Sequence, residues 1–216
     1  MKKIFAIIST VLFLTTVSAK ADFQFGVGLM LGELSADGKE TEGTAADTSV
    51  RKKSTEEMFY GADLFVEYVT EGEYTFGVSY VPMDFEIGSK SRVDTNGAAD
   101  IAAEADVGTR TAKANLSNMM GIYVNAPLGF GGLYGLVGAS HTTVDTKETL
   151  PNSKYGNKDI MGYSVGLGKR SGKFKMEISY TDFEDIALNS SVTDASGTNK
   201  VTADADALTL RMSLGF

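Results

Sequence analysis

The chain has 216 residues, of which 20 are Lys or Arg and 28 are Asp or Glu. Its formal net charge of −8 disfavours nucleic acid as a partner, and the absence of Cys excludes disulfide bonds as the device that holds the fold. After the first 21 residues there is no run of about 18 apolar residues, so we expect no membrane-spanning helix there.

The N-terminal segment has the composition of a secretory signal peptide. Met1-Lys2-Lys3 is a charged start, residues 4–17 are largely apolar, and Ala19-Lys20-Ala21 places small residues at the two positions that determine cleavage. We expect cleavage after Ala21. The mature chain, residues 22–216, then forms one domain with 17 basic and 28 acidic residues, a net charge of −11.

Eight segments of the mature chain alternate apolar and polar residues with a period of two, which is the pattern of β-strands. Three short turns and four long polar stretches connect them in strict alternation. Long extracellular loops and short periplasmic turns alternate in this way in transmembrane β-barrels. The strands are expected at 22–32, 60–68, 74–80, 112–124, 133–143, 161–168, 174–181 and 208–216, the turns at 70–73, 125–132 and 171–173, and the loops at 33–57, 86–110, 144–158 and 184–204.

Two of these strands have faces that are less clear. In 112–124, Leu116 shares an apolar face with Met120 and Ile122, but Asn118 interrupts it. In 133–143 the apolar residues fall on both faces, so its facing stays open.

Three features place the apolar faces on the outside of the barrel. The opposite faces are mostly Gly, Ser and Thr, which suits a lumen filled by packed side chains. Six apolar faces carry no charge, and a Lys or Arg at the centre of the lipid face costs about 2–4 kcal/mol. Aromatic residues gather at strand ends, as at membrane interfaces; they are Phe23, Tyr68, Tyr74, Phe174 and Phe216 at one end, and Tyr60, Tyr80 and Tyr180 at the other. A soluble barrel with its apolar face inward is disfavoured.

The last strand carries the most specific pattern. Leu208, Leu210, Met212, Leu214 and Phe216 occupy every second position, and the chain ends on the aromatic ring. This segment resembles the C-terminal strand of bacterial outer-membrane β-barrels, where it is the signal read by the barrel-assembly machinery.

Over the mature chain the pattern resembles the OmpA-like and OmpX-like eight-stranded outer-membrane family. The resemblance implies an all-β fold, an eight-stranded antiparallel transmembrane up-and-down β-barrel in the bacterial outer membrane, with both termini periplasmic. Its surroundings are then the lipid bilayer and lipopolysaccharide, and the barrel-assembly machinery is a partner. No room remains after Phe216 for the peptidoglycan-binding domain of OmpA, so a cell-wall tether is not expected.

Six charged residues fall on the lumen faces: Asp63, Glu67, Lys113, Lys175, Glu177 and Arg211. We predict an ion pair between Glu177 and Arg211, which lie at similar depth on neighbouring strands, because a desolvated charge needs a partner. Such charges form either a gate in a narrow conduit or a polar plug, and we favour the plug.

His141 is the single histidine, with Thr143 two residues on and Glu148 nearby. Lipid A deacylases are also eight-stranded barrels and use a His/Ser/Glu site, but here Thr stands where Ser is expected. Acidic residues are frequent in the predicted loops, where calcium binding or divalent-ion bridges to lipopolysaccharide are the alternative to plain solvation. Their spacing does not match an EF-hand; they are Glu40, Glu42, Asp47, Asp182, Glu184, Asp185, Asp204 and Asp206.

The sequence therefore predicts a non-enzymatic outer-membrane protein without a cofactor or metal. Its expected role is structural or is a surface interaction through long extracellular loops, whose ligand the sequence does not identify. A narrow or gated porin-like channel is the alternative, and a lipid A-modifying enzyme is a remote one.

Overall fold

The computed structural model describes residues 22–44, 47–94, 108–149, 155–194 and 197–216. The predicted signal peptide and its cleavage after Ala21 lie outside these residues. Within them, no helix is long and apolar enough to cross a membrane.

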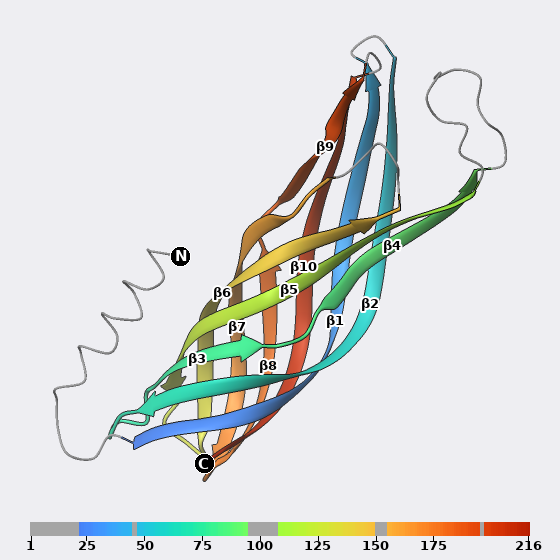
Figure 1. The fold of residues 1–216 in the computed structure, drawn as a ribbon. Helices are drawn as coiled ribbons and strands as arrows, with labels where there is room; N and C mark the ends of the chain where they lie inside the picture. The colour runs from blue at the N-terminus through green and yellow to red at the C-terminus, as the bar shows by residue number, and fades with distance from the viewer. Residues whose placement is uncertain (1–21, 45–46, 95–107, 150–154, 195–196) are drawn as a thin grey trace.

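The described residues form antiparallel β-strands that close into a ring (Figure 1). β1 pairs with β2 on one side and with β10 on the other, from Gly26 opposite Gly215 to Thr41 opposite Lys200. β3 and β4 share one position beside β5, and β8 and β9 share one beside β10, which gives eight positions in the described chain. The predicted fold class is confirmed. The strands are β1 (Asp22–Thr44), β2 (Asp47–Val69), β3 (Thr75–Val81), β4 (Phe85–Asp94), β5 (Gly108–Pro127), β6 (Leu133–Glu148), β7 (Lys158–Ser171), β8 (Phe174–Phe183), β9 (Ile186–Asp194) and β10 (Gly197–Gly215).

The ring has two distinct ends. The turn end holds Asp22, Phe216 and the three predicted short turns, among them the turn closed by the hydrogen bond from Thr70 N to Tyr74 O (2.9 Å). The opposite, hairpin end holds the connections that the sequence predicts as long loops. For 33–57 and 184–204 that prediction is wrong, because strands continue through most of these segments: β1 and β2 stay paired from Asp22 opposite Val69 to Thr44 opposite Asp47.

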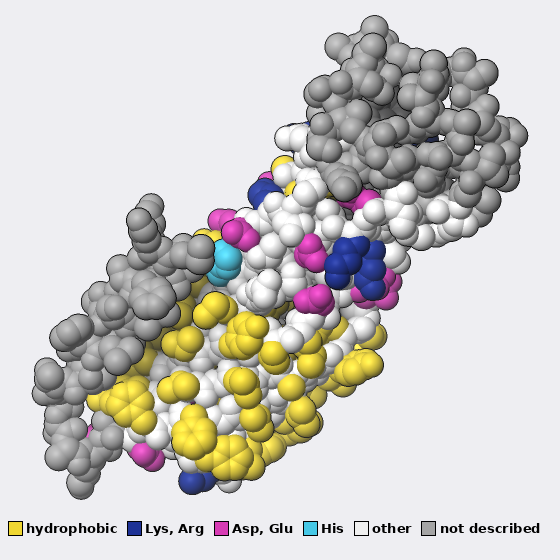
Figure 2. Space-filling view, in the orientation of Figure 1, with side chains coloured by type: hydrophobic (Ala, Val, Ile, Leu, Met, Phe, Trp, Pro, Cys, Tyr) yellow, Lys and Arg dark blue, Asp and Glu magenta, His cyan; other side chains and the backbone are white. Residues whose placement is uncertain are grey.

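An apolar outer band surrounds the turn half of the barrel. Leu29, Val165 and Ile178 illustrate it, with 62%, 59% and 50% of their surfaces exposed on the outer face. Figure 2 shows hydrophobic side chains covering this half, with charged side chains gathered beyond its edge. The predicted outward facing is therefore confirmed, and the band is the lipid-contacting exterior of a transmembrane barrel.

A β-bulge in β5 corrects one predicted face. Asn118 has a positive φ of 54°, and the pairing of β5 with β6 shifts between Ser117 and Met120. The extra residue reverses the alternation. Leu116 consequently points into the lumen, where it is 1% exposed, whereas Met120 lies outside.

The facing of β6, left open by the sequence, is also clear. Tyr134 is buried in the lumen, and Val137 is 57% exposed on the outside. His141 has the outward parity of Val137.

The hairpin half has an apolar interior. Its buried cluster includes Leu34, Leu116, Val144, Ile160 and Phe183. In Figure 1, β9, β10, β1 and β2 extend together in one direction while the β4–β5 hairpin diverges from them. The hairpin half of the barrel thus resembles two sheets packed on a common core.

Candidate functional site

A charged network fills the lumen at the turn half. Arg211 on β10 donates two hydrogen bonds to Asp63 on β2, from Nε to Oδ1 (2.9 Å) and from Nη2 to Oδ2 (2.6 Å). Its Nη1 donates to Glu177 Oε2 on β8 at 2.5 Å. The structure therefore brings the predicted pair of Glu177 and Arg211 into contact and adds Asp63 as a second carboxylate partner.

A second group of charges lies nearer the turn end. Glu67, with no exposed surface, accepts hydrogen bonds from Lys175 Nζ, from Arg170 Nη2 (2.9 Å) and from the Tyr123 hydroxyl (2.7 Å). Arg170 was not among the residues predicted for the lumen. It follows the predicted strand 161–168, although it has the same parity as the lumen-facing Gly166 and Gly168.

Aromatic rings separate the two groups. The Phe65 ring lies 4.5 Å from Lys175 Nζ and 4.9 Å from Arg211 Cζ, distances typical of cation–π contacts. Tyr134 joins the network as well, because its hydroxyl donates a hydrogen bond to Glu177 Oε1 at 2.9 Å. The network contains three cations and three carboxylates, so it is neutral and fills the turn half as a plug.

One predicted lumen charge lies elsewhere. Lys113 is on the opposite face of β5 from Leu116, with 44% of its side chain exposed, and pairs with Glu86 Oε2 at 2.5 Å. This hydrogen bond from Lys113 holds the pKa of the Glu86 carboxyl below its usual value. Lys113 was placed in the lumen because alternation was extended through Asn118, where the bulge reverses it.

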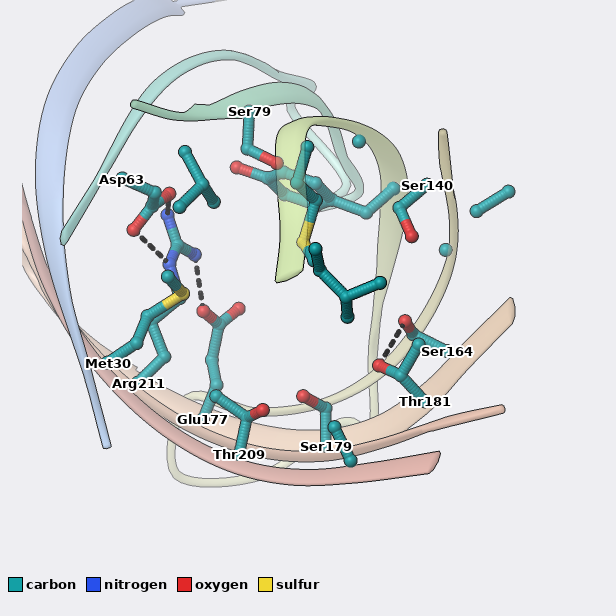
Figure 3. Close-up of a pocket in the computed structure, with 18 of the residues that line it drawn as sticks. Met30, Asp63, Ser79, Ser140, Ser164, Glu177, Ser179, Thr181, Thr209 and Arg211 are labelled. Carbon is teal, nitrogen blue, oxygen red and sulfur yellow. Dashed lines mark hydrogen bonds and ion pairs between the residues drawn. The ribbon is translucent and has the colours of Figure 1, made fainter. Parts of the chain in front are cut away.

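A cavity of about 150 Å³ lies directly above the plug. Figure 3 shows the Asp63–Arg211–Glu177 group on one side of it and the Ser164–Thr181 hydrogen bond (2.8 Å) on another. Apolar side chains from the hairpin half also line it, among them Leu34, Val81, Phe85, Leu116 and Phe183. The lumen therefore changes from charged to apolar at this level.

A larger cavity of about 500 Å³ lies at the hairpin end, between the two diverging sheets. Binding pockets for small molecules have about 300–1,000 Å³. Its apolar lining consists of Ala36, Ile87, Ala112, Ala114, Leu188, Val201 and Ala203, and its charged lining of Lys39, Glu40, Arg51, Lys52, Lys53, Lys90, Lys113 and Glu148.

A seam in the barrel wall borders this cavity. Pairing of β2 with β3 ends at Leu64 opposite Tyr80, and within the described chain no pairing joins β2 to β4. β3 stops before Pro82, which has no N–H for a ladder hydrogen bond. We define the seam as the gap between Lys53–Gly61 of β2 and Phe85–Lys90 of β4.

Side chains, and not backbone pairs, close the seam. Thr55 Oγ1 donates to Ile87 O at 3.0 Å, Lys53 Nζ donates to Ser89 O at 3.0 Å, and the Phe59 and Phe85 rings lie 4.7 Å apart. Lys53, Thr55, Ile87 and Ser89 also line the large cavity. The cavity wall is thus weakest along the seam.

His141 lies outside the barrel beside an acid other than the predicted one. Its Nε2 is 3.8 Å from Asp159 Oδ2, and Thr143 Oγ1 donates to Asp159 Oδ1 at 2.8 Å. Glu148 accepts a hydrogen bond from Tyr155 N and lines the large cavity, away from His141. The hydroxyl that the sequence compared with a nucleophile is therefore hydrogen-bonded to a carboxylate.

The predicted assembly segment forms the closing strand. Leu208, Leu210, Met212, Leu214 and Phe216 are all exposed on the outer face. Phe216 N donates to Phe25 O at 2.8 Å, and the two rings lie 6.1 Å apart.

The acidic residues at the hairpin end form no metal site within the described ranges. Asp204 lies close to Asp185, and the repulsion between these carboxylates raises the pKa of Asp204. Glu42 and Asp47 have side chains outside the described set.

No protein-family model matches the chain, and no curated protein matches it in sequence. Comparison with solved structures finds similar folds. The outer-membrane protein AlkL is 13% identical, with a TM-score of 0.48, over 93% of this chain and 94% of that one. OprG from Pseudomonas aeruginosa is 11% identical, with a TM-score of 0.46, over 89% and 97%. Ail of Yersinia pestis is 14% identical, with a TM-score of 0.34, over 87% and 99%.

At these identities the likeness concerns the fold alone. Closure of eight strands around a filled lumen, inside an apolar outer band, defines the fold as that of an outer-membrane β-barrel. Membership of the OmpA-like and OmpX-like family stays a prediction.

Proposed function

We propose that the protein is an integral barrel of the bacterial outer membrane whose hairpin end binds small apolar or amphipathic molecules. This is a surface-interaction role, with the ligand held in the large cavity between strands. The short turns then face the periplasm, and the hairpins face the outside. The bilayer and lipopolysaccharide surround the barrel, and the barrel-assembly machinery reads Leu208–Phe216.

The observation that carries this proposal is the reversal of the lining along the lumen. In β1 the inward residues are glycines at 26 and 28 in the turn half but Leu34 and Ala36 in the hairpin half, while Glu33 and Asp37 face outward there. An apolar interior above the membrane band contributes nothing to lipid contact. An apolar cavity in this place suits a ligand with apolar surface, because transfer of that surface out of water is favourable.

The charged plug argues against the channel alternative. Asp63, Glu177 and Arg211 are 2%, 2% and 12% exposed, and their hydrogen bonds cross the lumen. A solute would have to break several charge-assisted hydrogen bonds in order to pass.

A non-enzymatic role is part of the proposal. In the deacylase alternative, His141 would have to accept the Thr143 proton. Thr143 donates to Asp159 instead, and this does not support a nucleophile and base pair.

Fluorescence quenching tests ligand binding, because the chain has no Trp. A Tyr155→Trp reporter stands in the lining of the large cavity, and a Tyr163→Trp control stands on the lipid face. Each variant is refolded into phosphatidylcholine nanodiscs and titrated with 11-bromoundecanol, whose bromine quenches nearby indole. We expect saturable quenching of the Tyr155→Trp reporter above the linear quenching of the control. Equal, non-saturable quenching of both reporters contradicts the proposal.

A further inference from the structure

The large cavity combines an apolar floor with a cationic rim. Six Lys or Arg and two Glu border it, but Lys39, Lys52 and Lys113 have outward parity in their strands, so the lysines turned toward it are Lys53 and Lys90. The floor is built from small and branched apolar residues, of which Ala36, Ile87 and Leu188 are 6%, 5% and 7% exposed.

The charged groups around the cavity differ in their partners within the described residues. Glu40 pairs with Lys90 at 3.3 Å, Glu148 accepts hydrogen bonds from Tyr155 N, and Glu86, outside the lining, pairs with Lys113. Lys53 Nζ donates to a backbone carbonyl, Ser89 O, at 3.0 Å, and no ion pair between described residues neutralises it.

The two inward lysines are on the strands that border the seam. Lys53 extends from β2 to Ser89 O on β4, and Lys90 reaches from β4 to Glu40 on β1. Lys53 therefore spans the seam, and Lys90 reaches from the seam strand β4 across the cavity to β1. Lys90 is 51% and Glu40 26% exposed, so water partly screens the pair and a ligand anion can replace Glu40 at little cost.

We propose that the large cavity binds an anionic amphiphile, with its carboxylate or phosphate at Lys53 and Lys90 and its alkyl chain on the floor of Ala36, Ile87 and Leu188. The inference rests on the proposed function and names the ligand class of the same cavity. Lysine donates charge-assisted hydrogen bonds to carboxylate and phosphate alike, so the headgroup chemistry is shared. A free fatty acid and an anionic lipid of the outer leaflet are its two sources.

The test compares matched quenchers on the Tyr155→Trp reporter in phosphatidylcholine nanodiscs at neutral pH. We expect 11-bromoundecanoate to bind about tenfold more tightly than 11-bromoundecanol, a difference of about 1.4 kcal/mol. Raising the ionic strength from about 0.01 M to about 0.15 M should weaken only the acid. The Lys53→Gln/Lys90→Gln double variant should abolish the difference. Lys147→Gln, 62% exposed and paired with Asp145 outside the cavity, should keep it.

The outcomes separate this inference from the proposed function. Equal affinities for the acid and the alcohol overturn the anionic headgroup but leave the apolar cavity supported. Failure of both quenchers to exceed the Tyr163→Trp control overturns the cavity as well. A further measurement distinguishes the two sources of the ligand. It uses nanodiscs that contain brominated lipids and no free quencher. Stronger quenching by brominated phosphatidylglycerol than by brominated phosphatidylcholine identifies a bilayer lipid, and quenching by free 11-bromoundecanoate alone identifies a soluble amphiphile.

Discussion

Arg211 and Asp63 are joined by two parallel hydrogen bonds although their strands, β10 and β2, are not neighbours. β1 lies between them, and the bonds cross above Gly28. A Cβ built on Gly28 would touch Asp63 Oδ1 and lie 2.8 Å from Arg211 Nε. The missing side chain at Gly28 is therefore a condition for the bidentate pair.

We expect Gly28→Ala to destabilise the barrel by about 3 kcal/mol, because it forces apart a buried pair and leaves its charges poorly matched. Urea unfolding in lipid vesicles measures the change. Gly135→Ala is the matched control, since a Cβ there meets nothing within 4 Å. Equal stability of the two variants would argue against the role of Gly28.

Glu177→Gln should lower the free energy of unfolding, because it leaves Arg211 with one carboxylate and weakens the bond from Tyr134. Tyr134→Phe removes a single hydrogen bond and should cost about 1 kcal/mol. The double variant should cost less than the sum of the two, as for residues in one network. Strict additivity, or an unchanged Glu177→Gln protein, would contradict the network.

The bulge in β5 predicts an unusual substitution pattern at Asn118. Its φ of 54° suits Gly and Asn and strains a β-branched residue. Asn118→Gly should be close to neutral, whereas Asn118→Val should destabilise by about 1–3 kcal/mol. The comparison is made by thermal unfolding followed on gels, and a tolerated Val would place the bulge elsewhere.

The seam should open locally when its side-chain clamp is removed. Thr55→Val keeps the volume but loses the hydrogen bond to Ile87 O. We expect faster hydrogen exchange in β4 with little change in β8, because the clamp acts only at the hairpin half. Exchange that rises equally in both strands would indicate global destabilisation instead.

Much of the fold follows from residue alternation alone. The outward faces of β1, β8 and β10 and the short turns are readable because lipid contact and lumen filling impose opposite requirements on neighbouring residues. The contact between Glu177 and Arg211 is also readable, since these residues are directly opposite on adjacent strands.

The hairpin half was missed because its alternation has the opposite sense. Leu34 and Ala36 alternate with Glu33 and Asp37, and Ala203, Ala205 and Ala207 alternate with Asp204 and Asp206. The composition of these stretches is polar, which suggests loops. Their period of two, however, is that of strands whose inward face is apolar.

Contacts across the lumen could not be predicted at all. Asp63 meets Arg211, and Glu67 meets Arg170, because strand tilt and stagger set which depths face each other. The facing of Lys113 was mispredicted for a local reason. The bulge at Asn118 reverses the alternation of β5, so residues before it face the side opposite to the one that the pattern after it predicts.

The central claim is that the lumen is closed at the turn half and that the protein acts at its hairpin end. Single-channel conductance of the refolded protein in a planar bilayer tests it most directly. The account predicts no current from the folded barrel at neutral pH. Steady or gated current that changes with Glu177→Ala would contradict it and assign the charged network to a conducting pore.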